Sequence, residues 1–169
     1  GGGFAGLVRR ARTKPLIAAV EGPAVAGGTE IVLACDLVVA STTARFGLPE
    51  VKRSLVANAG GLFRLPRALP RNVAMELALT GDDLDADSAF RHGLVNRLVQ
   101  PGEALGVAME LADAINANAP LAVRASRKVV LAAHLLEDEE AFQMAADATR
   151  DVVGTEDFRE GPRAFVEKR

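Results

Sequence analysis

The stretch KPLIAAVEGPAVAGGTEIVLACDLVVA, residues 14–40, decides the fold. It contains two short apolar runs, 16–20 and 37–40, which are typical of strands buried on both faces of a parallel sheet. Between them a glycine pair predicts a tight turn that feeds a helix over 31–35. Strand, helix and strand in this order favour an α/β protein with parallel strands and crossover helices.

Helices dominate from residue 59 onward, with one more strand expected over 94–99. Apolar residues recur there at helical spacing, and capping residues mark the helix ends. We expect helices over 72–79, 86–92, 103–116, 121–136 and 138–153, and a last one from Thr155 through Arg163 and Phe165. Three or four short strands are too few for a sheet buried on both faces, so an upstream segment or a partner is expected to supply the others.

The composition is that of a soluble globular protein of one domain, with 169 residues, 49% apolar, 25% charged and a formal net charge of −2. No apolar run is long enough to span a bilayer. A near-neutral chain without Trp or Tyr offers nucleic acid neither electrostatic attraction nor stacking surfaces. The single cysteine, Cys35, excludes an internal disulfide and favours a reducing cytoplasm. Three opening glycines, without an initiator Met or a signal peptide, suggest a fragment.

A glycine pair and a glutamate at the first predicted helix are candidates for chemistry. The unpaired N–H groups at a helix N-terminus can hold an oxygen that becomes negative, and Gly27 and Gly28 would let a substrate approach them. A glycine pair can equally serve close packing of helix on strand. Glu30 lies in the first turn of a helix that is apolar nearly all round, so we expect its side chain to be buried.

A second glutamate follows the Leu48-Pro49 corner. Glu50 either belongs to a site or pairs at the surface with Lys52 or Arg53. If Glu30 and Glu50 meet in an apolar pocket, the two carboxylates cannot both ionise easily, and they could act as an acid and a base near neutrality.

The other polar residues favour structural roles. His92 precedes a helix-ending glycine, and His134 stands alone on an amphipathic helix, so no metal site is expected. Cys35 is expected in the core. The basic residues are expected to be solvated, namely Arg9, Arg10, Arg12 and Lys14. The dinucleotide, phosphate-loop, serine-hydrolase and zinc-protease motifs do not occur.

Several segments together resemble the crotonase (enoyl-CoA hydratase/isomerase) superfamily. The resemblance covers essentially the whole chain and corresponds to about the C-terminal two-thirds of such an enzyme, so its N-terminal third is missing. It is carried by residues 14–22, 24–30, 35–37, 44–50, 59–61, 74–81, 93–96 and 164–169.

This resemblance implies an α/β fold with a crotonase-like ββα spiral core and a helical C-terminal trimerisation region. Residues 1–100 would form the C-terminal part of the spiral core, without its N-terminal strands. Residues 101–169 would form the helical region that makes trimers and covers coenzyme A. A homotrimer or a dimer of trimers is therefore expected. No metal or redox cofactor is implied, because the thioester substrate supplies the electrophile.

The implied activity is that of an enoyl-CoA hydratase, a hydro-lyase of fatty acid metabolism that adds water reversibly to a 2-enoyl-CoA. Gly27 matches the glycine whose amide forms half of the oxyanion hole. Glu30 matches the glutamate that orients and deprotonates water for attack at the β-carbon. Glu50 matches the glutamate that exchanges a proton at the α-carbon.

Further positions match residues that bind the acyl-CoA substrate. Ala26 and Gly28 lie beside the oxyanion position, and the backbone at Asn58 would help to hold the water. Phe165 and Lys168 match residues that contact the adenine and phosphate end of coenzyme A in family trimers. Ala26 and Asn58 both stand where many hydratases have glycine. The second oxyanion donor of the family lies upstream of this chain.

Two alternatives stay open. One is another crotonase-type enzyme, either a double-bond isomerase or a dehydratase of a carnitinyl- or hydroxyacyl-CoA. The other is a catalytically weak fragment that binds acyl-CoA or assembles with a partner.

Overall fold

The computed structural model describes residues 1–156, 158 and 163. The chain divides into two compact units, Gly1–Leu111 and Ala112–Arg169. The first unit contains the sheets and the second is helical.

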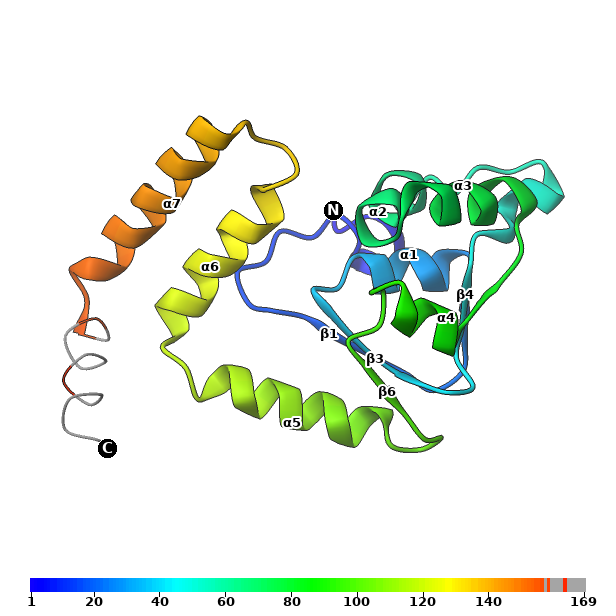
Figure 1. Ribbon diagram of the computed structural model, residues 1–169, viewed down its shortest axis with the longest axis horizontal. Coiled ribbons are helices and arrows are strands. Elements are labelled where there is room, and N and C mark those ends of the chain that lie inside the picture. The colour runs from blue at the N-terminus through cyan, green and yellow to red at the C-terminus, as the bar shows by residue number, and fades with distance from the viewer. Residues whose placement is uncertain (157, 159–162, 164–169) are drawn as a thin grey trace. The chain divides into compact units, whose positions relative to one another are not determined.

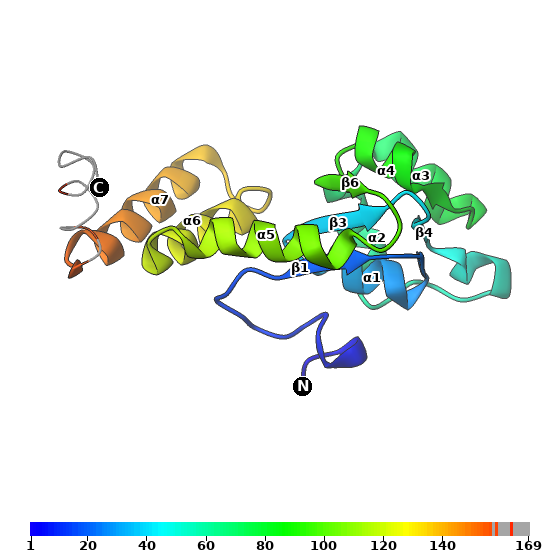
Figure 2. The same cartoon turned by 90° about the horizontal axis from the view of Figure 1, so that it is seen from below.

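The first sheet of the N-terminal unit is parallel throughout. It consists of β1 (Ile17–Val20), β3 (Leu37–Ser41) and β6 (Arg97–Val99) in the order β1-β3-β6. Figures 1 and 2 show β3 in the middle of the three. The central strand is almost fully buried from Val38 onward, whereas β1 is an edge strand of the described sheet and exposes Ala19. The predicted double burial is thus confirmed for β3 and wrong for β1.

A second small sheet contains β2 (Pro23–Val25), β4 (Arg45–Gly47) and β5 (Leu84–Asp85). Strands β2 and β4 are parallel, and β4 and β5 are antiparallel. The chain passes from β1 to β2 and then into a helix, and it repeats the same path from β3 to β4 and into helices. This succession is the predicted ββα spiral.

Short helices pack around these two sheets. They are α1 (Gly27–Leu33), α2 (Gly61–Ala68), α3 (Arg71–Thr80) and α4 (Ala86–Arg91), with 3-10 turns η1 (Phe4–Gly6) and η2 (Pro49–Arg53). Helices α1 and α2 lie side by side (Figures 1 and 2). The largest apolar side chains buried among them are Phe46, Leu48 and Leu65. This core fixes the ends of α1, η2 and α2, where the candidate residues lie.

Helix α5 (Ala104–Asn116) begins in the N-terminal unit, and a side chain from the end of β1 caps it. The Glu21 carboxylate accepts hydrogen bonds from the amides of Gly102 and Ala104, both at 2.8 Å. Ala104 and Ala108 then pack on Val39 of the central strand. A carboxylate is favoured at a helix N-terminus. Through these two hydrogen bonds Glu21 links the end of β1 to a helix that is distant in sequence.

The C-terminal unit contains α6 (Pro120–Ala132) and α7 (Asp138–Val153), which form a helical hairpin (Figure 1). Helix α7 starts with a capping box between Glu137 and Glu140. None of the helices in the described part of the chain is both long and apolar enough to cross a membrane.

Several element bounds differ from the sequence predictions. Helix α1 starts at Gly27, four residues before the predicted 31–35 segment, because the glycines continue the helix. Strand β6 starts only at Arg97, since Oδ1 of Asn96 accepts the hydrogen bond from the Val38 amide. Helix α6 ends at Ala132, so His134 lies beyond it. The sequence patterns did not predict the short strands β2, β4 and β5, which contain three, three and two residues, or helix α2.

Candidate active site

Glu30 is buried in the middle of α1, with only 4% of its surface exposed, which confirms the predicted burial. Its Oε1 accepts a hydrogen bond from the amide of Gly61, the first residue of α2, at 2.9 Å. A helix N-terminus stabilises negative charge, and the amide satisfies a buried carboxylate oxygen. Helix α2 therefore provides a defined anchor for this acidic side chain.

The neighbouring Thr29 fixes the start of α1. Its hydroxyl is fully buried, donates to the carbonyl of Ala24 at 2.5 Å and accepts from the amide of Gly47 at 2.8 Å. These bonds join α1 to β2 and to the end of β4. The orientation of Glu30 is thus set on one side by strand ends and on the other by α2.

Glu50 belongs to the 3-10 turn η2, directly after Pro49. Its side chain is half-buried, and its Oε2 is a buried atom with no hydrogen-bond partner among the described residues. The surface alternative, an ion pair with Lys52 or Arg53, is not formed among the described residues, and Lys52 instead pairs with Asp82 at 2.6 Å. An acceptor oxygen left without a donor is costly unless a ligand or a proton satisfies it.

The two glutamates line one pocket of about 490 Å³ in the N-terminal unit. Gly27 and Asn58, which the sequence analysis singled out, line it as well. The rest of the lining consists of Gly3, Phe4, Val8, Arg9, Leu55, Val56, Ala57 and Ala59. A second pocket of about 280 Å³ shares Glu50, Leu55, Val56 and Ala57 with the first, so Glu50 lies on the wall between two hollows.

A side chain at Gly27 would have to displace the ring of Phe4. A Cβ at Gly27 would lie 2.4 Å from Cε1 of Phe4, whereas at Gly28 the nearest atom would be the Cβ of Ala24 at 3.7 Å. The close approach at Gly27 is therefore to an aromatic ring at the pocket and not to a strand. Since Gly27 begins α1, the N–H groups of this first turn have no acceptor inside the helix.

Ala26, directly before Gly27, has a strained backbone. Its φ of 53° and ψ of −125° fall in a region that non-glycine residues rarely adopt. The Ala26 amide donates to the carbonyl of Gly47 at 2.8 Å, which holds the turn in place. The sequence feature noted at this position, alanine in place of a frequent glycine, thus coincides with real backbone strain.

The remaining predicted residues do not join the pocket. Ala26 and Gly28 lie beside it, and the described lining includes neither. Phe165 and Lys168 lie outside the described residues. His92 and His134 are exposed, and no group of three potential metal-ligating side chains occurs in the part of the chain that the structure describes.

Two expectations for other polar residues need correction. Arg12 is not solvated, because it lies 3.3 Å from Asp36 and donates to the carbonyl of Ala34. Cys35 is half-buried, just beyond α1, and burial raises the pKa of its thiol. Arg9, also expected to be solvated, is exposed but lines the pocket.

Phe4, Gly61 and Arg64 are further residues at the pocket or its supports that were not predicted from the sequence. Arg64, on α2, donates to the carbonyls of Val8 and Ala59, both of which line the pocket. The Gly60-Gly61 pair was a usable signal, because it repeats the pattern of a glycine pair at the start of a helix.

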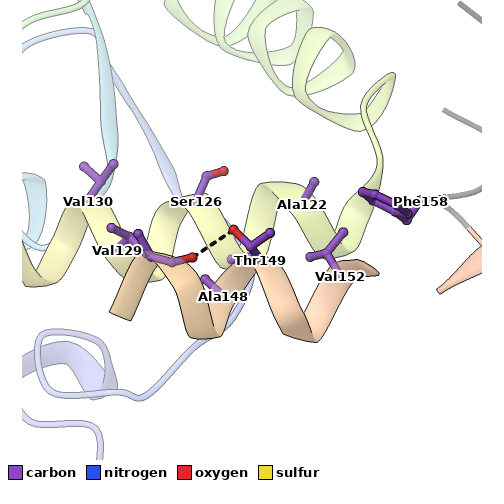
Figure 3. Close-up of a pocket in the computed structure, with 10 residues that line it drawn as sticks. Ala122, Ser126, Val129, Val130, Ala148, Thr149, Val152 and Phe158 are labelled. Carbon is purple, nitrogen blue, oxygen red and sulfur yellow. Dashed lines mark hydrogen bonds between the residues drawn. The ribbon is translucent and has the colours of Figure 1, made fainter. Parts of the chain in front are cut away.

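A separate pocket of about 430 Å³ lies between α6 and α7 in the C-terminal unit. Figure 3 shows its wall of small and apolar side chains, among them Ala122, Val129 and Val152. The hydroxyl of Thr149 is directed to the carbonyl of Ala145 at 2.9 Å. None of its described lining residues ionises, so it offers no acid–base chemistry.

Comparison with known proteins identifies the family. The family model described as enoyl-CoA hydratase/isomerase matches residues 8–169. The enoyl-CoA hydratase EchA19 of Mycobacterium tuberculosis is 47% identical over 163 residues, which cover 96% of this chain and 61% of that protein. A carnitinyl-CoA dehydratase of Proteus mirabilis is 41% identical over 173 residues, covering 99% of this chain and 66% of the relative.

Solved structures agree. A crystal structure of an enoyl-CoA hydratase from Mycobacterium tuberculosis superposes with a TM-score of 0.96 at 49% identity, covering 99% of this chain and 67% of that one. A carnitinyl-CoA hydratase from Mycobacterium avium gives a TM-score of 0.76 at 46% identity, covering 99% of this chain and 66% of the other. The chain belongs to the enoyl-CoA hydratase/isomerase family and has the predicted crotonase-like α/β fold. It spans 61% and 66% of the two curated relatives named above.

Proposed function

We propose that the natural protein containing this chain is an enoyl-CoA hydratase, a hydro-lyase that adds water reversibly to a 2-enoyl-CoA. The observation that carries this proposal is that Glu30 and Glu50, twenty positions apart, line one pocket together with Gly27. Hydration of an activated double bond needs a base that deprotonates water, an acid that gives a proton to the α-carbon, and a hydrogen-bond donor that stabilises the enolate oxygen. The three residues supply these groups.

In the proposed reaction a water molecule lies between the two carboxyl groups. Glu30 removes one of its protons while the oxygen attacks the β-carbon, and the electron pair of the double bond moves toward the thioester oxygen. The Gly27 amide stabilises that negative oxygen. Glu50 then delivers a proton to the α-carbon, which completes the 3-hydroxyacyl-CoA, and a proton passes from Glu30 to Glu50 to restore both groups.

Several structural features support this division of roles. The Gly61 amide stabilises a negative Glu30, as a base requires. The Oε2 of Glu50 has no donor among the described residues, as suits a group that exchanges protons with a ligand. The second oxyanion donor belongs to the family's N-terminal third, and removing one such donor typically costs about 2.7–4 kcal/mol, so residues 1–169 alone are expected to be a poor catalyst.

A dehydratase of a carnitinyl- or hydroxyacyl-CoA is the second candidate, because relatives with the printed name carnitinyl-CoA dehydratase match 99% of this chain. It uses the same groups in the reverse direction. For either enzyme we propose a trimeric assembly in the cytoplasm without a metal or redox cofactor. Phe165 and Lys168 would contact the adenine and phosphate end of coenzyme A, and the pathway would be fatty acid metabolism.

The test uses Glu30→Gln and Glu50→Gln in the natural full-length protein, with Glu110→Gln on the exposed face of α5 as the control. Loss of the conjugated enoyl absorbance is followed, and products from crotonyl-CoA and carnitinyl-CoA are separated by chromatography. Each site variant should be slower by about 10²- to 10⁴-fold, as for a removed acid–base group. A wild type that neither hydrates crotonyl-CoA nor dehydrates carnitinyl-CoA, or a variant with near-normal turnover, would refute the assignment.

A further inference from the structure

Arg64 joins two segments that are far apart in sequence and that both line the pocket. Its Nη2 donates to the carbonyl of Val8 at 2.7 Å, and its Nη1 approaches the carbonyl of Ala59 at 3.4 Å. Val8 precedes β1 and is buried, whereas Ala59 belongs to the loop between η2 and α2. The guanidinium thus lies behind the pocket wall and connects its two sides.

The preceding glycine makes this position possible. Gly60 is the N-cap of α2 with a φ of 114°, and a Cβ placed there would lie 2.2 Å from Nη1 of Arg64. Any side chain at residue 60 would displace the guanidinium. The Phe63 ring also holds it, with its centroid 5.1 Å from the guanidinium carbon.

The electrostatic surroundings of Arg64 are unfavourable apart from one group. Burial lowers the pKa of Arg64, and the nearby Arg12 and Arg67 lower it further. The Glu30 carboxylate opposes this shift. A charged guanidinium that is partly buried beside two other arginines lowers the stability of the fold, and the attraction of the Glu30 carboxylate offsets part of this cost.

We propose that Arg64 is a positioning residue of the active site, which holds the Val8 segment and the loop 57–59 at a fixed separation beside Glu30. This inference rests on the proposed function, because its kinetic consequence requires an acyl-CoA to lie between these walls. The loop carries Asn58, so a shift of the loop moves the backbone expected to hold the water. Misplacement of reacting groups by about 1 Å can cost 10²-fold in rate.

The chain offers a matched control on the same helix. Arg67 also lies over the Phe63 ring, at 5.3 Å, but its side chain is exposed and no described hydrogen bond joins it to the pocket wall. Arg64→Ala and Arg67→Ala therefore remove the same charge and the same type of ring contact. They differ in that only Arg64→Ala also removes the hydrogen bonds to the carbonyls of Val8 and Ala59 in the pocket wall.

The experiment compares Arg64→Ala, Arg64→Lys and Arg67→Ala in the natural full-length protein, with kcat and KM measured on crotonyl-CoA. We expect Arg64→Ala to lower kcat by about 10- to 100-fold, Arg64→Lys to recover part of it, and Arg67→Ala to stay within about twofold. Added guanidinium ion at non-denaturing concentration should restore activity to Arg64→Ala, whereas equimolar sodium chloride should not.

Two outcomes would overturn the inference. One is an equal effect of the two alanine variants, and the other is a loss in Arg64→Ala that follows only its lowered Tm and does not respond to guanidinium. Amide hydrogen exchange gives a readout without substrate, in which residues 57–59 of Arg64→Ala should exchange faster than those of Arg67→Ala. If the wild type lacks hydratase activity while this exchange difference is present, the proposed function fails. The inference that Arg64 holds the loop 57–59 in place then still stands.

Discussion

The backbone amide of Gly61 donates a hydrogen bond to Oε1 of Glu30 across 31 positions of sequence, with the two atoms 2.9 Å apart. A backbone donor cannot rotate away as a side chain can, and it lies at the positive end of α2. The carboxylate of Glu30 is therefore oriented by a helix terminus.

A methyl group at residue 61 should impair the site directly. In Gly61→Ala the new Cβ would lie 3.1 Å from Oε1 of Glu30 and 3.0 Å from both Cδ atoms of Leu48. We expect kcat of the full-length protein to fall by about tenfold or more, because the carboxylate is pushed out of line. Gly106→Ala on α5 is the control, since nothing lies within 4 Å of its new Cβ. Activity of Gly61→Ala equal to that of Gly106→Ala would contradict this role.

Glycine at residue 26 should relieve strain beside the pocket. Ala26 has a φ of 53° and a ψ of −125°, so we expect Ala26→Gly to stabilise the fold by about 1 kcal/mol. Urea unfolding measures the free-energy difference. Ala24→Gly, in strand β2, is the control and should destabilise the protein, because glycine weakens a strand. A loss of stability in Ala26→Gly would show that the strained turn has no cost.

Loss of the Glu21 carboxylate should loosen the start of α5. Glu21→Ala removes the acceptor of two amide hydrogen bonds, those of Gly102 and Ala104, and we expect a cost of about 1 kcal/mol, as for other helix caps. Amide exchange at these two residues should accelerate. The exposed Glu110→Ala on the same helix should leave both the stability and the exchange unchanged. Unaltered protection at residue 104 would contradict the capping role.

Asp85 should make part of the protein's stability against unfolding depend on pH. Its side chain caps α4 by accepting from the Ser88 amide at 2.7 Å, and this bond lowers the pKa of Asp85. A lowered pKa means that the carboxylate contributes stability above its unfolded pKa and that this contribution is lost as the pH falls through the folded value. Asp85→Asn retains a capping oxygen that does not titrate. The urea midpoint of the wild type should therefore drop relative to that variant below about pH 4. Parallel curves would contradict the cap.

The sequence predicted those elements whose pattern is strong and long. The apolar runs gave β1 and β3, and helical spacing gave α3, α5 and α7 within one or two residues. The start of α4 was predicted at the right residue, because the preceding Asp85 is a carboxylate of the kind that prefers a capping position. Strands β2, β4 and β5 were missed because two or three residues cannot express a periodicity, and β2 begins with a proline.

The sequence predicted the two acidic residues of the candidate site but not the residues that hold them in place. Burial of Glu30 followed from the apolar helix around it, and its shared pocket with Glu50 was expected from the family resemblance. Gly61 and Arg64 act through a backbone amide and through contacts with backbone carbonyls. Such partners depend on how separate segments meet in space, and no local spacing encodes them.

Two of the edge strands, β1 and β2, have a practical consequence for anyone who handles residues 1–169 as a separate polypeptide. On their outer sides β1 and β2 present backbone donors and acceptors without a strand partner in the described sheets. Residues 16–20 carry no charge that would discourage another chain from pairing there. Dilute solutions, or a lysine in place of the exposed Ala19, should keep such a polypeptide from assembling into larger particles.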